Sequence, residues 1–193
     1  MNRFAKGAIA GAAGILLLLS GAGTFALWNG SASAAAGSVK SGTMTIATDA
    51  VAGAWSVTHG SGSATAISNI ANFRAVPGDV LTFTQKVDVT ASGDNLSAVL
   101  SIDPASIKAG DASPSSAALV TALTSGMTVA VGTPLPTGVT AGTAANTYNV
   151  SGTTGTTVLT VSVTLPFDSN TTGTVAQGGT VDLSALGFKL AQQ

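Results

Sequence analysis

Two stretches of this sequence alternate between apolar and polar residues, and they limit the possible fold more than any other feature. The clearer one is Val80–Thr90, where only Gln85 interrupts the apolar set, and Thr157–Leu165 repeats the pattern. A period of two places the two sets of side chains on opposite faces of an extended strand. Weaker alternation occurs in Gly42–Thr48, Ala54–Thr58, Leu96–Ile102, Met127–Val131 and Val181–Leu190.

Turn-forming residues between these stretches predict how the strands connect. Pro77–Gly78 fits the centre of a type II turn, because proline fixes φ and glycine tolerates a positive φ. Ser92–Asn95 follows the strand predicted from Val80, and the next strand begins at Leu96, so these two strands are predicted to form an antiparallel hairpin. At Gly187 the alternation changes phase, which predicts a β-bulge.

These observations together predict an all-β fold. Short strands separated by turns, with at most one short helix inserted at Ser115–Leu123, are typical of a single antiparallel β-sandwich, and we expect a jelly-roll-like one. The predicted organisation is a signal peptide at residues 1–26, an N-terminal segment at 27–41 that we expect to be flexible, and the β-sandwich domain at 42–193.

The predicted signal peptide has the three parts that secretion requires. Arg3 and Lys6 give a positive start, Ala8–Leu19 is apolar, and small residues up to Ala26 offer a cleavage site. An uncleaved membrane anchor is the alternative, but the Gly- and Ala-rich sequence favours cleavage, so the membrane is expected to hold only the leader before cleavage. A second possible cut follows Ala36, and the local residues alone do not decide between the two.

Composition excludes several classes of function. The chain contains no cysteine, so an exported domain cannot use disulfides and relies on its core and backbone pairing for stability. Export without disulfides favours a Gram-positive bacterium as the source. Without the leader, five basic and eight acidic side chains remain, a net charge of −3. No cluster of lysine or arginine is present to bind nucleic acid or an anionic membrane surface. A polar surface with so little charge favours self-association of exposed strands.

The residues needed for catalysis are scarce, and we expect no enzymatic activity, no cofactor and no metal. His59 is the only histidine and is interpreted as an exposed loop residue, since zinc hydrolysis and serine nucleophiles need further His or Glu partners. Four aspartates lie near one another in the sequence, but they lack the spacing of a calcium-binding loop and are interpreted as solvated turn residues. These are Asp88, Asp94, Asp103 and Asp111.

Four short motifs resemble the TasA/camelysin family of SipW-dependent secreted proteins. Gly21–Asn29 is similar to the leader junction of that family, and Gly42–Ile46 to the strand that follows it. Pro77–Asp79 before an alternating strand and Val181–Leu186 near the end are the other two. The resemblance implies a β-sandwich, cleavage by signal peptidase between Ala26 and Leu27, and a secreted matrix or biofilm subunit. Camelysins were assigned to the metalloproteases, and this sequence gives no support for that activity.

The resemblance further implies self-association into fibres, in which the new N-terminal segment of one subunit completes the sandwich of the next. The expected donor residues are Leu27, Trp28, Asn29, Gly30, Ser31, Ala32 and Ser33. The alternative is a monomeric secreted module that binds polysaccharide or a surface partner, with Trp28 or Trp55 as an aromatic platform. Both functions place the protein outside the cell, in the matrix or at the cell surface.

Overall fold

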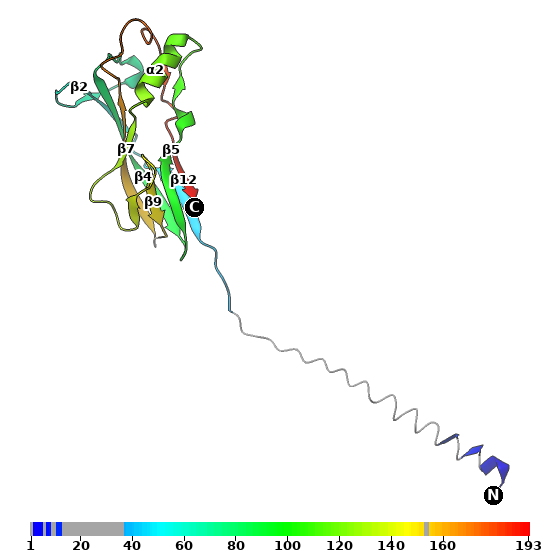
Figure 1. Ribbon diagram of the computed structural model, residues 1–193. Coiled ribbons are helices and arrows are strands. Elements are labelled where there is room, and N and C mark those ends of the chain that lie inside the picture. The colour runs from blue at the N-terminus through cyan, green and yellow to red at the C-terminus, as the bar shows by residue number, and fades with distance from the viewer. Residues whose placement is uncertain (1, 6, 9–10, 13–36, 153–154) are drawn as a thin grey trace. The chain divides into compact units, whose positions relative to one another are not determined.

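The computed structural model describes residues 2–5, 7–8, 11–12, 37–152 and 155–193 (Figure 1). The chain divides into two units, Met1–Val39 and Lys40–Gln193, and the fold below is that of the second unit. Among the described residues, no helix is long and apolar enough to cross a membrane. The predicted cleavage site and donor residues, Ala26 to Ser33, lie outside the described residues.

The second unit is an all-β structure with a single α-helix among its described residues, as predicted. The helix α2 spans Pro114–Thr124, and two short 3-10 helices are η1 at Ile70–Asn72 and η2 at Pro104–Ser106. The strands are β1 Thr43–Thr48, β2 Ala54–His59, β3 Thr65–Ile67, β4 Asp79–Ser92, β5 Ser97–Ile102, β6 Lys108–Ala109, β7 Thr128–Val131, β8 Val139–Ala141, β9 Tyr148–Ser151, β10 Thr156–Pro166, β11 Val181–Asp182 and β12 Phe188–Gln192.

The strands form two antiparallel sheets and one small extra pair. The first sheet has the order β3-β2-β4-β10-β7, and β1 pairs with the half of β4 that β2 leaves free. The second sheet has the order β12-β5-β9-β8, and β11 pairs with β6. The pair β5–β9 is nested in sequence within the pair β4–β10, which is the pairing of a rolled-up hairpin. The predicted jelly-roll-like sandwich is therefore confirmed.

The alternation in β4 and β10 builds the centre of the core. These two strands pair from Thr90 opposite Thr156 to Val80 opposite Pro166, so their inward side chains meet along the whole length. Val87 and Leu159 are cross-strand partners and both are fully buried. Alternate residues of the second sheet close the core from the other side, and the buried ones include Ala98, Leu100, Ile102, Val139 and Val150.

Gln85, the residue that interrupts the apolar face of β4, lies where the neighbouring strand is broken. It is buried, and its amide group donates hydrogen bonds to the carbonyls of Val51 and Lys86, at 3.0 and 2.9 Å. The chain between β1 and β2 passes so close that a Cβ at Gly53 would collide with Phe83 and Gln85. The polar side chain thus supplies the hydrogen bonds that a continuous strand would otherwise make here.

The turn between Val76 and Asp79 has the predicted form. The Asp79 N–H donates to the Val76 carbonyl at 3.0 Å, and Gly78 has a φ of +96°. Glycine adopts this conformation without the clash that a Cβ would cause. The type II turn predicted from Pro77–Gly78 is confirmed.

Two predicted connections are wrong. The strands on either side of Ser92–Asn95 do not pair, because β4 lies in the first sheet and β5 in the second. A short turn can join two strands of one sheet or carry the chain across a sandwich, and the buried residues alternate in the same way in both cases. The phase change at Gly187 is likewise no bulge. It marks the passage from β11, which pairs with β6, to β12, which pairs with β5.

Hydroxyl and carboxylate groups hold the N-terminus of α2. The Ser113 hydroxyl caps the helix by accepting a hydrogen bond from the Ser116 N–H at 3.2 Å, and Pro114 follows it. The buried Ser116 hydroxyl accepts a hydrogen bond from the Thr180 N–H at 2.8 Å. Asp111 accepts hydrogen bonds from the Ser113 N–H and the Thr180 hydroxyl, at 2.8 and 3.1 Å. These contacts join the loop before β11 to the helix.

The carboxyl of Asp111 should make stability depend on pH. Hydrogen bonds from the side chain and backbone of Ser113 hold its pKa well below the ordinary value. A carboxylate whose pKa is lowered by folding stabilises the folded state at any pH above the ordinary pKa of aspartate, about 3.9. This contribution decreases as the pH falls below that value and is lost once the pH has passed the pKa of the folded state. We therefore expect Asp111→Asn to lower the Tm at neutral pH, with a difference that shrinks below about pH 4.

Thermal unfolding followed by circular dichroism, over a series of pH values, measures this difference. Asp94→Asn is the matched control, since Asp94 is exposed in the turn after β4. A decrease in Tm that is the same at every pH would contradict an origin in the ionised Asp111 carboxylate.

Candidate functional site

The side chains considered for chemistry lie apart from one another. His59 is the last residue of β2 and not a loop residue, and its side chain is 66% exposed. Its Nδ1 lies 2.7 Å from Oδ1 of Asp79, which is buried. Asp79 also accepts a hydrogen bond from the Val76 N–H at 2.9 Å, so the pair fixes the turn before β4. Within the described residues, no group of three His, Cys, Asp or Glu side chains could hold a metal ion.

Trp55, the described residue of the two expected aromatic platforms, lies in β2. Its side chain is half-buried and packs against the core, with its ring centroid 5.0 Å from that of Phe83. The two residues are also cross-strand partners in β2 and β4. Trp28 lies outside the described residues. The indole of Trp55 therefore has one part in contact with the core and one part exposed.

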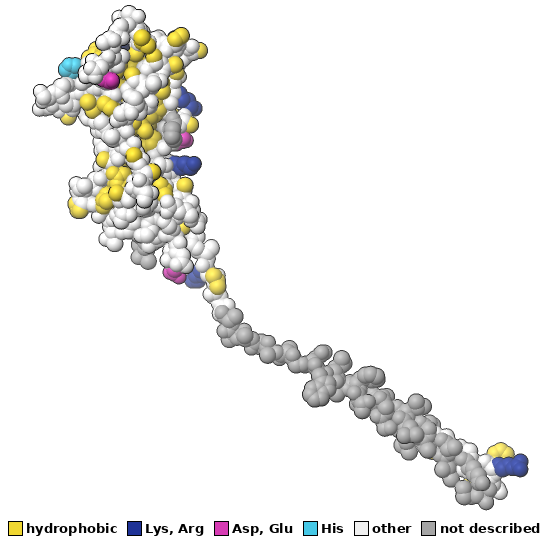
Figure 2. Space-filling model, in the orientation of Figure 1, with side chains coloured by type: hydrophobic (Ala, Val, Ile, Leu, Met, Phe, Trp, Pro, Cys, Tyr) yellow, Lys and Arg dark blue, Asp and Glu magenta, His cyan; other side chains and the backbone are white. Residues whose placement is uncertain are grey.

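The surface of the sandwich carries few charges. Figure 2 shows one face, on which lysine, arginine and acidic side chains are sparse. On the outward face of the first sheet, the strand register places Thr128, Thr164, Thr82 and Ser56 side by side across four strands. The next row along β4 is built from Ala130, Ser162, Thr84 and Ala54. This face therefore presents small, uncharged side chains in regular rows.

One lateral edge of the first sheet is closed by side chains. Strand β7 pairs with β10, and no second strand of the described residues pairs with it. On its other side the Val129 N–H donates to Oδ1 of Asn146 at 2.8 Å, and the Val131 N–H donates to the Tyr148 hydroxyl at 3.1 Å. The Asn146 amide donates to the Met127 carbonyl at 2.9 Å, and the Tyr148 hydroxyl donates to that of Val129 at 3.3 Å.

These four hydrogen bonds replace a neighbouring strand. They occupy backbone groups of Met127, Val129 and Val131, which are alternate residues along this edge. An added strand would need these same groups for its own hydrogen bonds. Asn146 reaches them from a left-handed conformation, with a φ of +63°, which asparagine tolerates better than most residues. Tyr148 belongs to β9, so its hydroxyl also links the second sheet to the first. We call this set of contacts the closed edge.

The opposite edge of the first sheet is shared by β3 and β1, because β2 and β1 pair with different halves of β4. Strand β1 pairs with β4 on one side, and no strand of the described residues pairs with its other side. It lies beside β12, the last strand of the second sheet, which pairs only with β5 among those same residues (Figure 1). Both sheets therefore end here with unpaired strands. We call the outer side of β1 the open edge.

Sequence reasoning missed the closed edge and could not place the open one. The contacts of Asn146 and Tyr148 span 17 to 19 residues and leave no repeated pattern in the sequence. The amphipathic pattern of β1 predicts a strand but does not predict which strand it will pair with.

The fold defines a class: an all-β sandwich with jelly-roll-like pairing of its strands. No family profile, no curated protein and no solved structure matches this chain.

Proposed function

We propose that this chain is a secreted structural protein, a subunit of an extracellular matrix or biofilm fibre or of a cell-surface layer, that assembles by β-strand donation. The observation that supports the proposal best is the contrast between the two edges of the first sheet. Side chains satisfy the backbone groups of β7, whereas the outer side of β1 pairs with no other strand of the described residues.

The donor in this proposal is the segment from Leu27 to Ser33, released when signal peptidase cuts after Ala26. A donated strand gains backbone hydrogen bonds along the accepting edge and places alternate side chains against the acceptor. Leu27 and Trp28 would supply the apolar contacts. Donation by one subunit to the next leaves each subunit with a donor and an acceptor, so that the assembly can continue.

The low number of charged side chains on the surface supports the same function. Like charges on neighbouring copies repel, and long charged side chains protect exposed strands from pairing. The outward face of the first sheet carries rows of threonine, serine and alanine, with Lys86 and Asp88 as its charged residues on β4. Copies of this chain can therefore approach closely without a large electrostatic cost.

Electron microscopy of negatively stained protein tests whether cleavage starts assembly. We expect fibres from the chain that begins at Leu27 and separate particles from the uncleaved precursor. The control is a chain that begins at Gly42, which lacks the proposed donor and is expected to stay monomeric. Fibres formed by this shorter chain would rule out donation by Leu27–Ser33, and separate particles from all three chains would rule out assembly.

Disulfide trapping tests which edge accepts the donor. The protein contains no cysteine, so two single-cysteine variants carrying different affinity tags can be mixed and oxidised. We expect Ser31→Cys to form mixed dimers with Thr45→Cys on β1 in preference to Ala130→Cys on β7. Thr45 and Ala130 are both exposed, which makes them a matched pair. Equal yields from the two mixtures would contradict donation at the open edge.

A further inference from the structure

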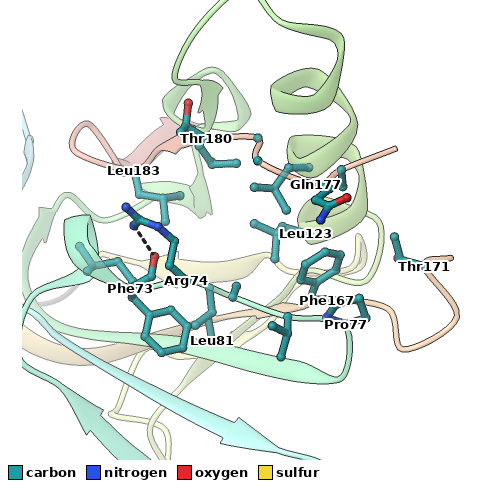
Figure 3. A pocket seen from close by; sticks show the side chains of 18 of the residues that line it. Phe73, Arg74, Pro77, Leu81, Leu123, Phe167, Thr171, Gln177, Thr180 and Leu183 are labelled. Atoms are coloured by element: carbon teal, nitrogen blue, oxygen red, sulfur yellow. Dashed lines mark hydrogen bonds between the residues drawn. The ribbon is translucent and has the colours of Figure 1, made fainter. Parts of the chain in front are cut away.

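A cavity of about 660 Å³ lies beside α2 (Figure 3). Four parts of the chain enclose it: the loop from Ile70 to Pro77, the start of β4, helix α2, and residues 167–183. Its size lies within the range of about 300–1,000 Å³ that is usual for small-molecule sites.

The cavity is mainly apolar. Its base consists of Leu81, Leu123 and Phe167, each of which is buried in the core. Phe73 and Leu183 are half-buried and line the cavity as well (Figure 3). The hydrogen bonds of Ser116 to Thr180 hold the loop before β11 against the helix, so the walls are fixed relative to each other. An apolar surface of this extent favours a ligand with a hydrocarbon body.

Arg74 is the only ionisable residue among those that line the cavity. Its Nη1 donates hydrogen bonds to the carbonyls of Phe73 and Ala71, at 3.2 and 3.5 Å, and both partners belong to its own loop. Within the described part of the chain, the single ion pair joins His59 to Asp79, so no carboxylate neutralises this arginine. A guanidinium group has five N–H donors, and most of those of Arg74 remain available to a ligand.

We propose that this cavity binds the anion of a small aliphatic carboxylic acid, with the hydrocarbon chain on Leu81, Leu123 and Phe167 and the carboxylate on Arg74. The planar guanidinium group matches a carboxylate through two parallel hydrogen bonds. The absence of acidic side chains from the lining disfavours a cation. The proposal concerns a different part of the molecule from strand donation and does not depend on it.

Isothermal titration calorimetry of the full chain with decanoate, below its micelle concentration, tests the proposal. We expect one molecule of decanoate per chain, weaker binding of decanol, and no measurable binding of acetate. Arg74→Gln should weaken decanoate binding by about tenfold or more, because a charge-assisted bidentate contact is lost, and should leave decanol unaffected. Arg74→Lys should fall between the two, since lysine keeps the charge but not the planar donor pair.

The control variant is Lys86→Gln, which removes an exposed cation of β4 that does not line the cavity. It should bind decanoate as the unsubstituted protein does. Absence of decanoate binding would overturn the proposal, and so would equal affinity for decanoate and decanol or an unchanged affinity in Arg74→Gln. Circular dichroism of each variant checks that the sandwich is folded, so that a loss of binding reports on the cavity.

Discussion

Replacing Leu159 by alanine should lower the free energy of unfolding by about 2–5 kcal/mol, the range for large-to-small substitutions in a packed core. Leu159 is fully buried in β10, where it lies opposite Val87 of β4, between the two sheets. The loss is a large fraction of the total stability of a typical domain, about 5–15 kcal/mol. Urea unfolding followed by circular dichroism measures the change through the transition midpoint.

The adjacent residue supplies the control. Val158 lies on the other face of the same strand and is 53% exposed, so Val158→Ala should cost about 1 kcal/mol or less. Similar losses in the two variants would mean that β10 does not have one face in the core and one in solvent. The comparison therefore tests the sandwich, and not merely the presence of a strand.

Removal of the Asp79 carboxylate by alanine should destabilise the protein by about 1–3 kcal/mol, the cost of leaving hydrogen-bonding groups without a partner in a buried place. The carboxylate is buried and is bonded to His59 at 2.7 Å and to the Val76 N–H at 2.9 Å. It fixes the turn from which β4, the longest strand, begins. The same urea experiment measures the effect.

His59→Gln separates the two partners of Asp79. In this variant the Asp79 carboxylate keeps its hydrogen bond from the Val76 N–H, and the substituted position is largely exposed to water, so the variant should cost less than Asp79→Ala. If the two substitutions cost the same, the imidazole rather than the Val76 N–H would be the partner that matters. In that case the turn would depend on a contact at the surface.

The sequence was sufficient to predict the class of fold because the signals for it are local. Alternation in Val80–Thr90 and Thr157–Leu165 corresponds to β4 and β10, and Ser115–Leu123 corresponds to α2. The turn at Pro77–Gly78 was also predictable, since the conformations of proline and glycine are properties of those residues. Each of these predictions depends on residues within one turn or one strand.

Pairing and sites could not be predicted in this way, because they depend on residues far apart in the chain. The burial pattern of β5 is the same whether it pairs with β4 or faces it across the core, so the predicted hairpin was wrong. Arg74 precedes a turn and gives no sign that Leu123 and Leu183 will enclose a cavity beside it. The predicted donor residues stay a prediction, since Leu27–Ser33 lie outside the described residues.

The difference between the closed and the open edge has a consequence for the geometry of any assembly. Two copies that each offered two free edges could join sideways in either direction and merge into broad sheets. Asn146 and Tyr148 cover β7, so in the proposed assembly a copy would accept the donated strand at the open edge and not at the closed edge. Contacts between unlike surfaces repeat without closing unless the rotation between copies completes a ring. Such an assembly is a polar filament whose two ends differ, so that growth at one end can be blocked without affecting the other.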